Sequence, residues 1–209
     1  MTTATEPTTE DRVKSAAVRL FSAKGFAATG IREIAHEAGI SVASLYHYMD
    51  TKEELLLSLM LDGMNSLLEP ATQVLASEGG PSEHLVRLVD IHVSFHCSRA
   101  ALARVTDAEL RSLSPEPRRS VIDLRDAYEN LWLSSITDGK SDGTFTVAEP
   151  RLATLAVLEM CTGVSHWYSP DGRFSVERIA RYYAGLALRL LGHGGADTID
   201  RLELAGQQN

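Results

Sequence analysis

Three side chains with metal-binding chemistry lie close together near the middle of the chain. His92 and His96 are four residues apart, a spacing that puts them on one face of a helix, and Cys97 is beside them. Imidazole and thiolate are zinc ligands, so one interpretation is a metal site. The alternative is that these residues line a pocket or are partly exposed. We expect no metal site, because no carboxylate or second cysteine lies at ligand spacing.

Two further sets of side chains could bind an organic ligand. Arg125, Tyr128 and Trp132 recur on one face of a predicted helix. The arginine could pair with an anion through two hydrogen bonds, and the aromatic rings could stack on an apolar part. The alternative is an aromatic stripe of the core with a surface arginine. Thr162 and His166 also share a helical face, so both could point into a pocket.

No pattern in the chain is typical of an enzyme. Catalysis needs a nucleophile with a base and a group that orients it, or a metal constellation. Serine, histidine and cysteine are present, but the chain has no nucleophile elbow, phosphate-binding loop or metal signature. The sequence therefore predicts a protein that is not an enzyme and has no cofactor.

Composition places the chain among ordinary globular proteins of the cytoplasm. The two cysteines, Cys97 and Cys161, do not form a disulfide framework, and no apolar run is long enough to span a membrane. The net charge of −8 is a mild argument against a nucleic-acid partner. A DNA-binding protein needs positive charge on its contact face, however, and not over the whole chain.

Hydrophobic periodicity predicts an all-helical fold of about nine helices, which must position these side chains. The expected helices cover residues 10–24, 31–38, 42–49, 51 to past 68, 82 to past 96, 100–113, 118–136, 149–168 and 175–191. Pro70 is expected to kink or break the fourth helix. Residues 114–117 and 139–143 are expected to separate helices.

The sharpest local pattern runs from Gly30 to Met49. A short helix, a tight turn at 39–41 and a second short helix are what a helix-turn-helix requires, and such a unit places its second helix in the major groove. That second helix begins with small residues, which allow close approach to base edges. It ends with Tyr46, His47 and Tyr48, whose polar groups suit phosphate contacts. The alternative is that the two tyrosines pack in the core.

Residues 20–35 and 38–55 resemble the DNA-binding domain of the TetR family of transcriptional regulators. The resemblance implies that one set of side chains faces DNA, mostly phosphate: Thr29, Ser41, Ser44, Tyr46, His47 and Lys52. It also implies that bases are read by Ser41, Val42, Ala43 and His47. The sequence departs from the family pattern at Gly30, where serine or threonine is usual, and at Tyr48 and Met49, where histidine or asparagine and phenylalanine are usual.

A second resemblance covers residues 161–172, which carry a Trp-Tyr-x-Pro-x-Gly signature. It is similar to a TetR subgroup that includes steroid-catabolism repressors of actinobacteria, and it implies acyl-CoA thioesters as one class of effector. The residues that we expect to bind the effector are His92, His96, Arg125, Tyr128, Trp132, Thr162 and His166. The last two helices carry many small and apolar residues, which favours pairing with a second copy.

These observations predict a helix-turn-helix domain at 8–52, an effector-binding and dimerisation domain at 53–193, and a flexible tail at 194–209. The family resemblance implies a cytoplasmic homodimer that represses from a palindromic operator in double-stranded DNA. A small-molecule effector is expected to release it, with no membrane association. The alternative is a TetR-like protein that has lost operator binding and acts as a protein-interaction partner, which Gly30 and the acidic balance leave open.

Overall fold

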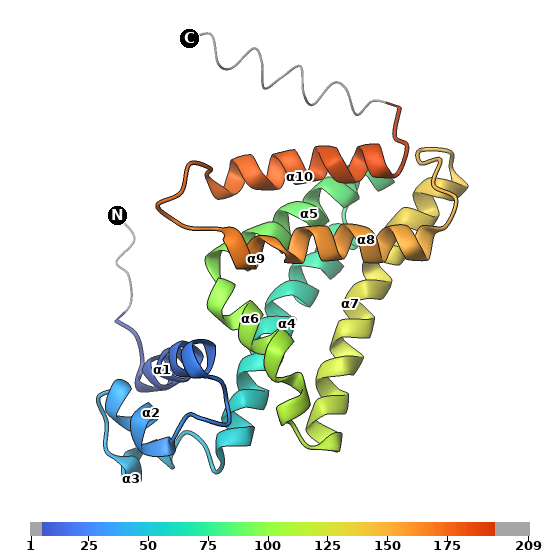
Figure 1. Cartoon of the computed structure of the whole chain (residues 1–209). Coiled ribbons are helices and arrows are strands. Elements are labelled where there is room, and N and C mark those ends of the chain that lie inside the picture. Colours follow the sequence, from blue (N-terminus) through green and yellow to red (C-terminus); the bar gives the residue numbers. More distant parts are fainter. Residues whose placement is uncertain (1–5, 195–209) are drawn as a thin grey trace. The chain divides into compact units, whose positions relative to one another are not determined.

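The computed structural model describes residues 6–194, and every regular element among them is a helix. The chain divides into two compact units. One contains the residues up to 65 together with 101–124, and the other contains 66–100 and the residues from 125 onward. Figure 1 shows the helices in chain order. The predicted all-helical class is confirmed.

The first unit contains the helix-turn-helix. Its elements are α1 (Thr9–Lys24), α2 (Ile31–Glu37), α3 (Val42–Leu45), the first part of α4 (Lys52–Ala76), nearly all of α6 (Ala100–Glu109), the 3-10 turn η1 (Leu110–Ser112) and the start of α7 (Pro115–Ser141). Helix α1 begins where the Thr8 hydroxyl accepts a hydrogen bond from the Asp11 backbone N–H, 3.1 Å away. Its buried face carries Val13, Ala17 and Phe21, and α2 packs against it.

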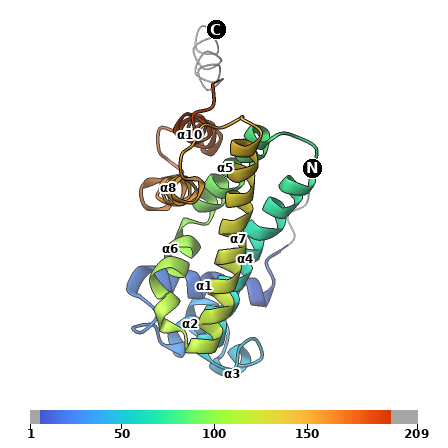
Figure 2. The same cartoon turned by 90° about the vertical axis from the view of Figure 1, so that its right-hand side faces the viewer.

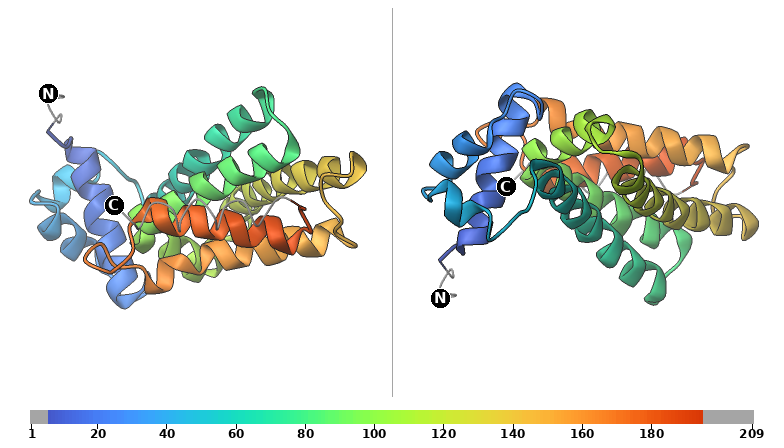
Figure 3. Two further views of the ribbon diagram at one scale, coloured as in Figure 1. Left: turned by 90° about the horizontal axis from the view of Figure 1, so that it is seen from above. Right: turned by 90° about the horizontal axis from the view of Figure 1, so that it is seen from below.

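The second unit is built around α5 (Pro81–Ser98), which contacts α8 (Pro150–Thr162), α9 (Val164–Trp167) and α10 (Val176–Leu190). Figures 2 and 3 show α8 and α10 side by side, covering one side of α5. Helix α10 approaches α5 most extensively, and its buried residues include Ala180, Ala184, Gly185 and Ala187. The small residues that suggested pairing with a second copy are therefore used, in α10, for packing inside the chain.

Two proline-containing segments differ from the prediction. Helix α4 continues through Pro70, although the proline removes one backbone donor. Leu67, Ala71 and Val74 are buried on either side of it, so their packing outweighs the lost hydrogen bond. Helix α7 begins at Pro115, inside the expected break, because the first turn of a helix has no use for the missing N–H.

Two glycines also shift the expected boundaries. Gly139 lies within α7 rather than in a turn, and the Phe145 ring fills the space where a Cβ would be. Gly163 separates α8 from α9, which the sequence predicted as one helix, so residues 6–194 contain ten α-helices instead of nine. The third helix is shorter than expected and ends at Leu45, followed by a turn at 46–48.

None of the helices in the described part of the chain is long and apolar enough to cross a membrane. The predicted flexible tail, from 195 on, lies outside the described residues.

Candidate functional site

The turn between α2 and α3 depends on Gly39. Its φ is +69°, a left-handed conformation that costs little only for glycine, and no atom lies within 4 Å of the place where a Cβ would stand. The Ile40 backbone N–H then donates to the Ala35 carbonyl, 3.0 Å away, which closes the turn. This geometry sets the direction in which α3 leaves α2.

Helix α3 is only four residues long and is held by its cap and its buried side. The Ser41 side chain accepts from the Ser44 backbone N–H at 3.0 Å, and the two hydroxyls lie 2.8 Å apart. Leu45 and Met49 are buried, and both anchor the segment to the rest of the unit. So short a helix keeps its position through these contacts and not through its own propensity.

The opposite side of α3 and of the turn after it faces solvent. Tyr46 is 49% exposed and Tyr48 is 42% exposed, and His47 and Ala43 are exposed beside them. Val42 is half-buried. The exposure of the two tyrosines excludes the interpretation that they simply pack in the core. Several hydrogen-bonding side chains are thus presented together on one anchored surface.

Thr29 and Lys52 are placed differently from the expectation that both face DNA. Thr29 is buried, and its hydroxyl donates to the Gly25 carbonyl at 2.8 Å. The Lys52 ammonium donates to the carbonyls of Phe26 and Thr29 at 2.7 and 2.8 Å and lies 4.3 Å from the centre of the Phe26 ring. Both side chains are used to hold the loop between α1 and α2, because that loop has carbonyls that no helix satisfies.

Gly30, where the family usually has a hydroxyl, caps α2 through its neighbours. Its backbone N–H donates to the Glu33 carboxylate at 2.7 Å, so one half of a capping box remains. Glu33 also pairs with Lys24, and the hydrogen bond from Lys24 lowers the pKa of the Glu33 carboxyl. The start of α2 is therefore fixed without the serine or threonine.

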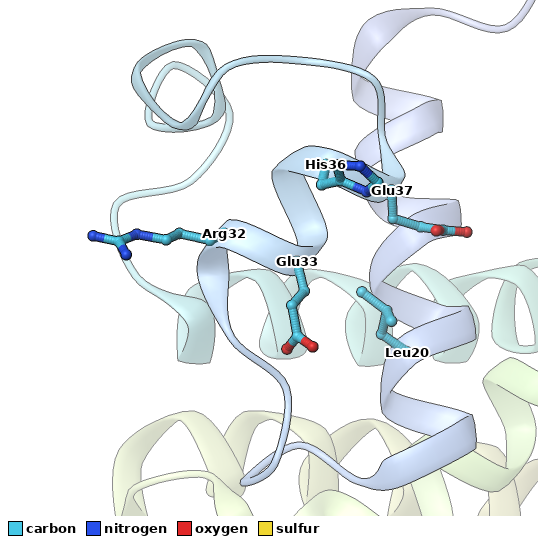
Figure 4. Close-up of a pocket in the computed structure, with 5 residues that line it drawn as sticks. All are labelled: Leu20, Arg32, Glu33, His36 and Glu37. Carbon is cyan, nitrogen blue, oxygen red and sulfur yellow. The ribbon is translucent and has the colours of Figure 1, made fainter.

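Sequence reasoning missed Arg32, an exposed cation on α2. Figure 4 shows its guanidinium pointing away from the Glu33 and Leu20 side chains. The hollow on α1 and α2 is lined by Leu20, Arg32, Glu33, His36 and Glu37. Glu37 is paired there with Arg19 at 3.0 Å. Arg32 could have been found from its charge, because it is one of few cations in the helix-turn-helix segment and lies on the first of its two helices.

The second unit contains a buried polar cluster centred on His92. One imidazole nitrogen lies 3.1 Å from the Tyr128 hydroxyl, and the other lies 3.0 Å from the Thr162 hydroxyl. His96 stacks on His92 with ring centres 4.0 Å apart, and its Nδ1 lies 2.8 Å from the His92 carbonyl oxygen. Trp132 meets His92 edge to face at 5.7 Å. The cluster joins α5, α7 and α8.

Burial favours the uncharged forms of His92 and Tyr128 in this cluster, and of the buried Cys161 thiol. Burial, with a smaller contribution from His96, holds the pKa of His92 well below 6.5. Burial also raises the pKa of the Tyr128 hydroxyl, which the neighbouring Trp132 offsets only partly. The thiol of Cys161 has its pKa raised by burial to about 12. The cluster therefore offers neutral hydrogen-bonding groups.

The structure brings together five of the seven residues expected to bind an effector, namely His92, His96, Tyr128, Trp132 and Thr162. Arg125 is half-buried and lies one helical turn before Tyr128. His166 is exposed on α9, because the break at Gly163 interrupts the register that would have paired it with Thr162. No three His, Cys, Asp or Glu side chains between residues 6 and 194 are arranged to hold a metal ion.

Large apolar side chains are exposed in two places on the described part of the chain. One is the Tyr46–Tyr48 surface of α3. The other is the segment from α8 to α10, here called the α8–α10 face, where Leu152 and Leu155 of α8, Trp167 of α9, Phe174 before α10, and Tyr182 and Leu190 of α10 are exposed. Leu152 is the most exposed of these, at 66%. Large apolar side chains exposed on neighbouring elements are typical of a surface that another protein covers.

Comparison with known proteins finds two family models that match different parts of the chain. Residues 15–59 match the family model described as bacterial regulatory proteins, tetR family, and residues 78–191 match the tetracyclin repressor-like C-terminal domain. The HTH-type transcriptional repressor KstR2 of Mycolicibacterium smegmatis is 27% identical over 180 residues, which cover 85% of this chain and 88% of that protein.

Solved structures have the same fold. The TetR family regulator PfmR of Thermus thermophilus is 32% identical, with a TM-score of 0.79 over 85% of this chain and 97% of its own. AibR, solved in complex with isovaleryl coenzyme A and operator DNA, is 23% identical, with a TM-score of 0.75 over 86% of this chain and 97% of its own. The C-terminal model alone spans more than half of the sequence, so the chain belongs to the TetR family of bacterial regulatory proteins.

Proposed function

We propose that this protein is a repressor that binds a near-palindromic operator as a homodimer and leaves it when a small-molecule effector binds. The observation that carries the proposal is the anchored, exposed surface of α3. Leu45 and Met49 fix the segment, while Tyr46 and His47 project into solvent. A helix-turn-helix presents its second helix to the major groove in this way.

The contacts with DNA divide into two kinds. Ser41, Val42, Ala43 and His47 are the residues proposed to read bases, because they lie on α3 or directly flank it and are not buried. Ser44, Tyr46 and Arg32 are proposed to bind phosphate, which fixes the register but carries no sequence information. Thr29 and Lys52 contribute indirectly, since their hydrogen bonds hold the loop before α2.

Dimerisation is proposed to cover the α8–α10 face. Leu152 and Leu155 lie one turn apart on α8, and Tyr182 is half exposed on α10. Two such helices from each copy would form a four-helix interface with twofold symmetry. A twofold dimer with its two α3 helices about one DNA turn apart requires an operator whose halves are inverted repeats.

Acyl-CoA thioesters are the proposed class of effector. The support is the AibR structure, which contains isovaleryl coenzyme A together with operator DNA, and the buried polar cluster of this chain. The residues proposed to bind the effector are His92, His96, Arg125, Tyr128, Trp132, Thr162 and His166. Arg125 is the cation among them, so it suits the phosphates of coenzyme A, whereas the neutral cluster suits the acyl end.

Release requires that the effector bind one conformation of the dimer more tightly than the other. A conformation in which the two α3 helices have the wrong spacing cannot fill both operator halves. An effector that binds this second conformation more tightly would therefore release the dimer from the operator. A hundredfold preference would weaken operator binding by up to about 100-fold, equivalent to about 2.7 kcal/mol.

Fluorescence anisotropy with the intergenic DNA upstream of the protein's own gene tests the proposal. Specific binding that weakens steeply with salt, and that octanoyl-CoA or isovaleryl-CoA reverses, is the expected result. His47→Ala should reduce affinity for the operator, and His36→Ala, which changes an exposed histidine on α2, is the matched control. Absence of specific binding at low salt would favour a protein-interaction partner instead.

A further inference from the structure

The indole N–H of Trp132 is a buried donor without a hydrogen bond. Trp132 is fully buried, and Nε1 meets no acceptor in hydrogen-bond geometry among the described residues. It interacts with the Tyr128 hydroxyl closely enough to lower the pKa of that group, but not in the geometry of a formed hydrogen bond. The other such atom is the Nε of Arg118, but that guanidinium also donates to the carbonyls of Arg111 and Leu113. Tryptophan has no second polar atom, so the side chain makes no well-formed hydrogen bond at all. Buried donors of this kind are rare in native proteins.

The donor lies inside the polar cluster and not in an apolar layer. The Trp132 ring is 6.2 Å from the Tyr128 ring and 5.7 Å from His92. His92 in turn is joined to Thr162, the half-buried member of the cluster on α8. A ligand that displaced the Thr162 side of the cluster would bring an acceptor into a group of preorganised neutral partners.

We propose that the Trp132 indole N–H donates a hydrogen bond to an uncharged oxygen of the effector, the thioester carbonyl, and that this cluster selects the thioester over the free carboxylate. The inference rests on the proposed function, since it assigns the acyl end of that effector to a named donor. It follows from the unused N–H together with the neutral hydroxyls and imidazole that surround it.

The selectivity has a physical cause. A carboxylate moved beside His92, Tyr128 and Thr162 would lose its hydration there and meet an unprotonated imidazole and neutral hydroxyls, because burial keeps His92 unprotonated. A thioester carbonyl has no charge to desolvate and gains one hydrogen bond. We therefore expect a neutral ester to bind at least about tenfold more tightly than the acid of the same chain length.

Trp132 can be observed directly by NMR, because the chain has only two tryptophans. Loss of one of the two indole N–H signals in Trp167→Phe assigns the other to Trp132. Methyl octanoate and octanoate are then titrated as probes. The expected result is a downfield shift of the Trp132 signal with the ester, and the same shift with octanoate only at about tenfold or higher concentration. Equal affinity for the two probes, or a Trp132 signal that no probe moves at millimolar concentration, overturns the inference.

Trp132→Phe removes the donor and replaces the fully buried indole by a smaller phenyl ring, so the unfolding midpoint should also fall. Affinity for methyl octanoate, measured where the variant is folded, should fall about fivefold, the loss typical of one neutral hydrogen bond. Thr137→Ala, at an exposed position on α7, is the control. Operator release by octanoyl-CoA without a Trp132 shift overturns this inference alone, whereas a Trp132 shift without release overturns the proposed effector alone.

Discussion

The ammonium group of Lys52 donates a hydrogen bond to the backbone carbonyl of Thr29, 2.8 Å away, so the first residue of α4 holds the loop that precedes α2. The same group donates to the Phe26 carbonyl at 2.7 Å. The Glu109 carboxylate accepts from the Phe26 N–H at 3.0 Å, which ties this loop to α6 as well. The position of α2 within its unit therefore depends on Lys52 and Glu109, which are not part of the exposed surface proposed to bind DNA.

Replacing Lys52 by methionine should destabilise the first unit. The change keeps the length of the side chain but leaves two carbonyls without their donor, and hydrogen bonds from charged groups contribute about 1.5–3 kcal/mol each. Because Lys52 is only half-buried, water can replace part of these contacts, so we expect a total loss of about 1–3 kcal/mol in the free energy of unfolding, measured by urea denaturation, and weaker operator binding.

Lys24→Met is the control for this change. It removes an exposed ion pair with Glu33, a kind of contact that contributes between about 0 and 1 kcal/mol. If the two variants lost the same stability, the two hydrogen bonds of Lys52 would have no special role in the loop.

Gly39→Ala should weaken both the fold and DNA binding. The residue has a φ of +69°, where a side chain costs about 1–2 kcal/mol even though no atom obstructs it. Gly143 has a φ of +82° and equally open space, so Gly143→Ala should lose similar stability. Only Gly39→Ala should lower operator affinity beyond what unfolding explains, as measured by anisotropy, because only that turn orients α3. Equal operator affinity for the two variants would argue against this role.

Most of the fold could be predicted because its signals are local. The turn at 39–41 and helices α1 and α2 are each indicated by residues close together in sequence, and the structure contains all three. The errors arose where packing between distant residues decided the result. Helix α4 passes through Pro70 because Leu67 and Ala71 are buried by other elements, and no local pattern reveals that burial.

The candidate sites could be predicted only in part for the same reason. Tyr128 and Trp132 were proposed from their spacing, but both contact His92 on another helix, and Tyr128 lies 36 residues from it in sequence. Thr29 was expected at the surface because the family resemblance carries residue types and not burial. The orphaned N–H of Trp132 is a property of its surroundings, so no sequence pattern could indicate it.

Leu152→Glu should convert the proposed dimer into monomers. Leu152 is 66% exposed on the α8–α10 face, so the substitution does not disturb the core, but it would place a charge within the proposed interface. Light scattering during size-exclusion chromatography should show half the mass of the wild type. Thr137→Glu, at an exposed position on α7, should leave the mass unchanged. If Leu152→Glu were still a dimer, the dimer interface would not be the α8–α10 face.

His92 should make the protein less stable in mild acid. Burial holds its pKa in the folded state well below the value near 6.5 expected in the unfolded chain. Below about pH 6.5 the unfolded chain therefore binds a proton that the folded protein does not, so unfolding becomes more favourable as the pH falls. The contribution reaches about 1.4 kcal/mol for each pH unit between those two pKa values.

The measurement is urea denaturation of the wild type and of His92→Gln at pH 7 and pH 5. Glutamine can still hydrogen-bond to Tyr128 or Thr162 but cannot titrate, so the variant should lose less stability between the two pH values than the wild type does. His47→Gln, which changes an exposed histidine, should behave as the wild type. An identical loss in wild type and His92→Gln would mean that His92 is protonated in the folded protein as readily as in the unfolded chain. The proposed acyl site would then not be neutral below pH 6.5.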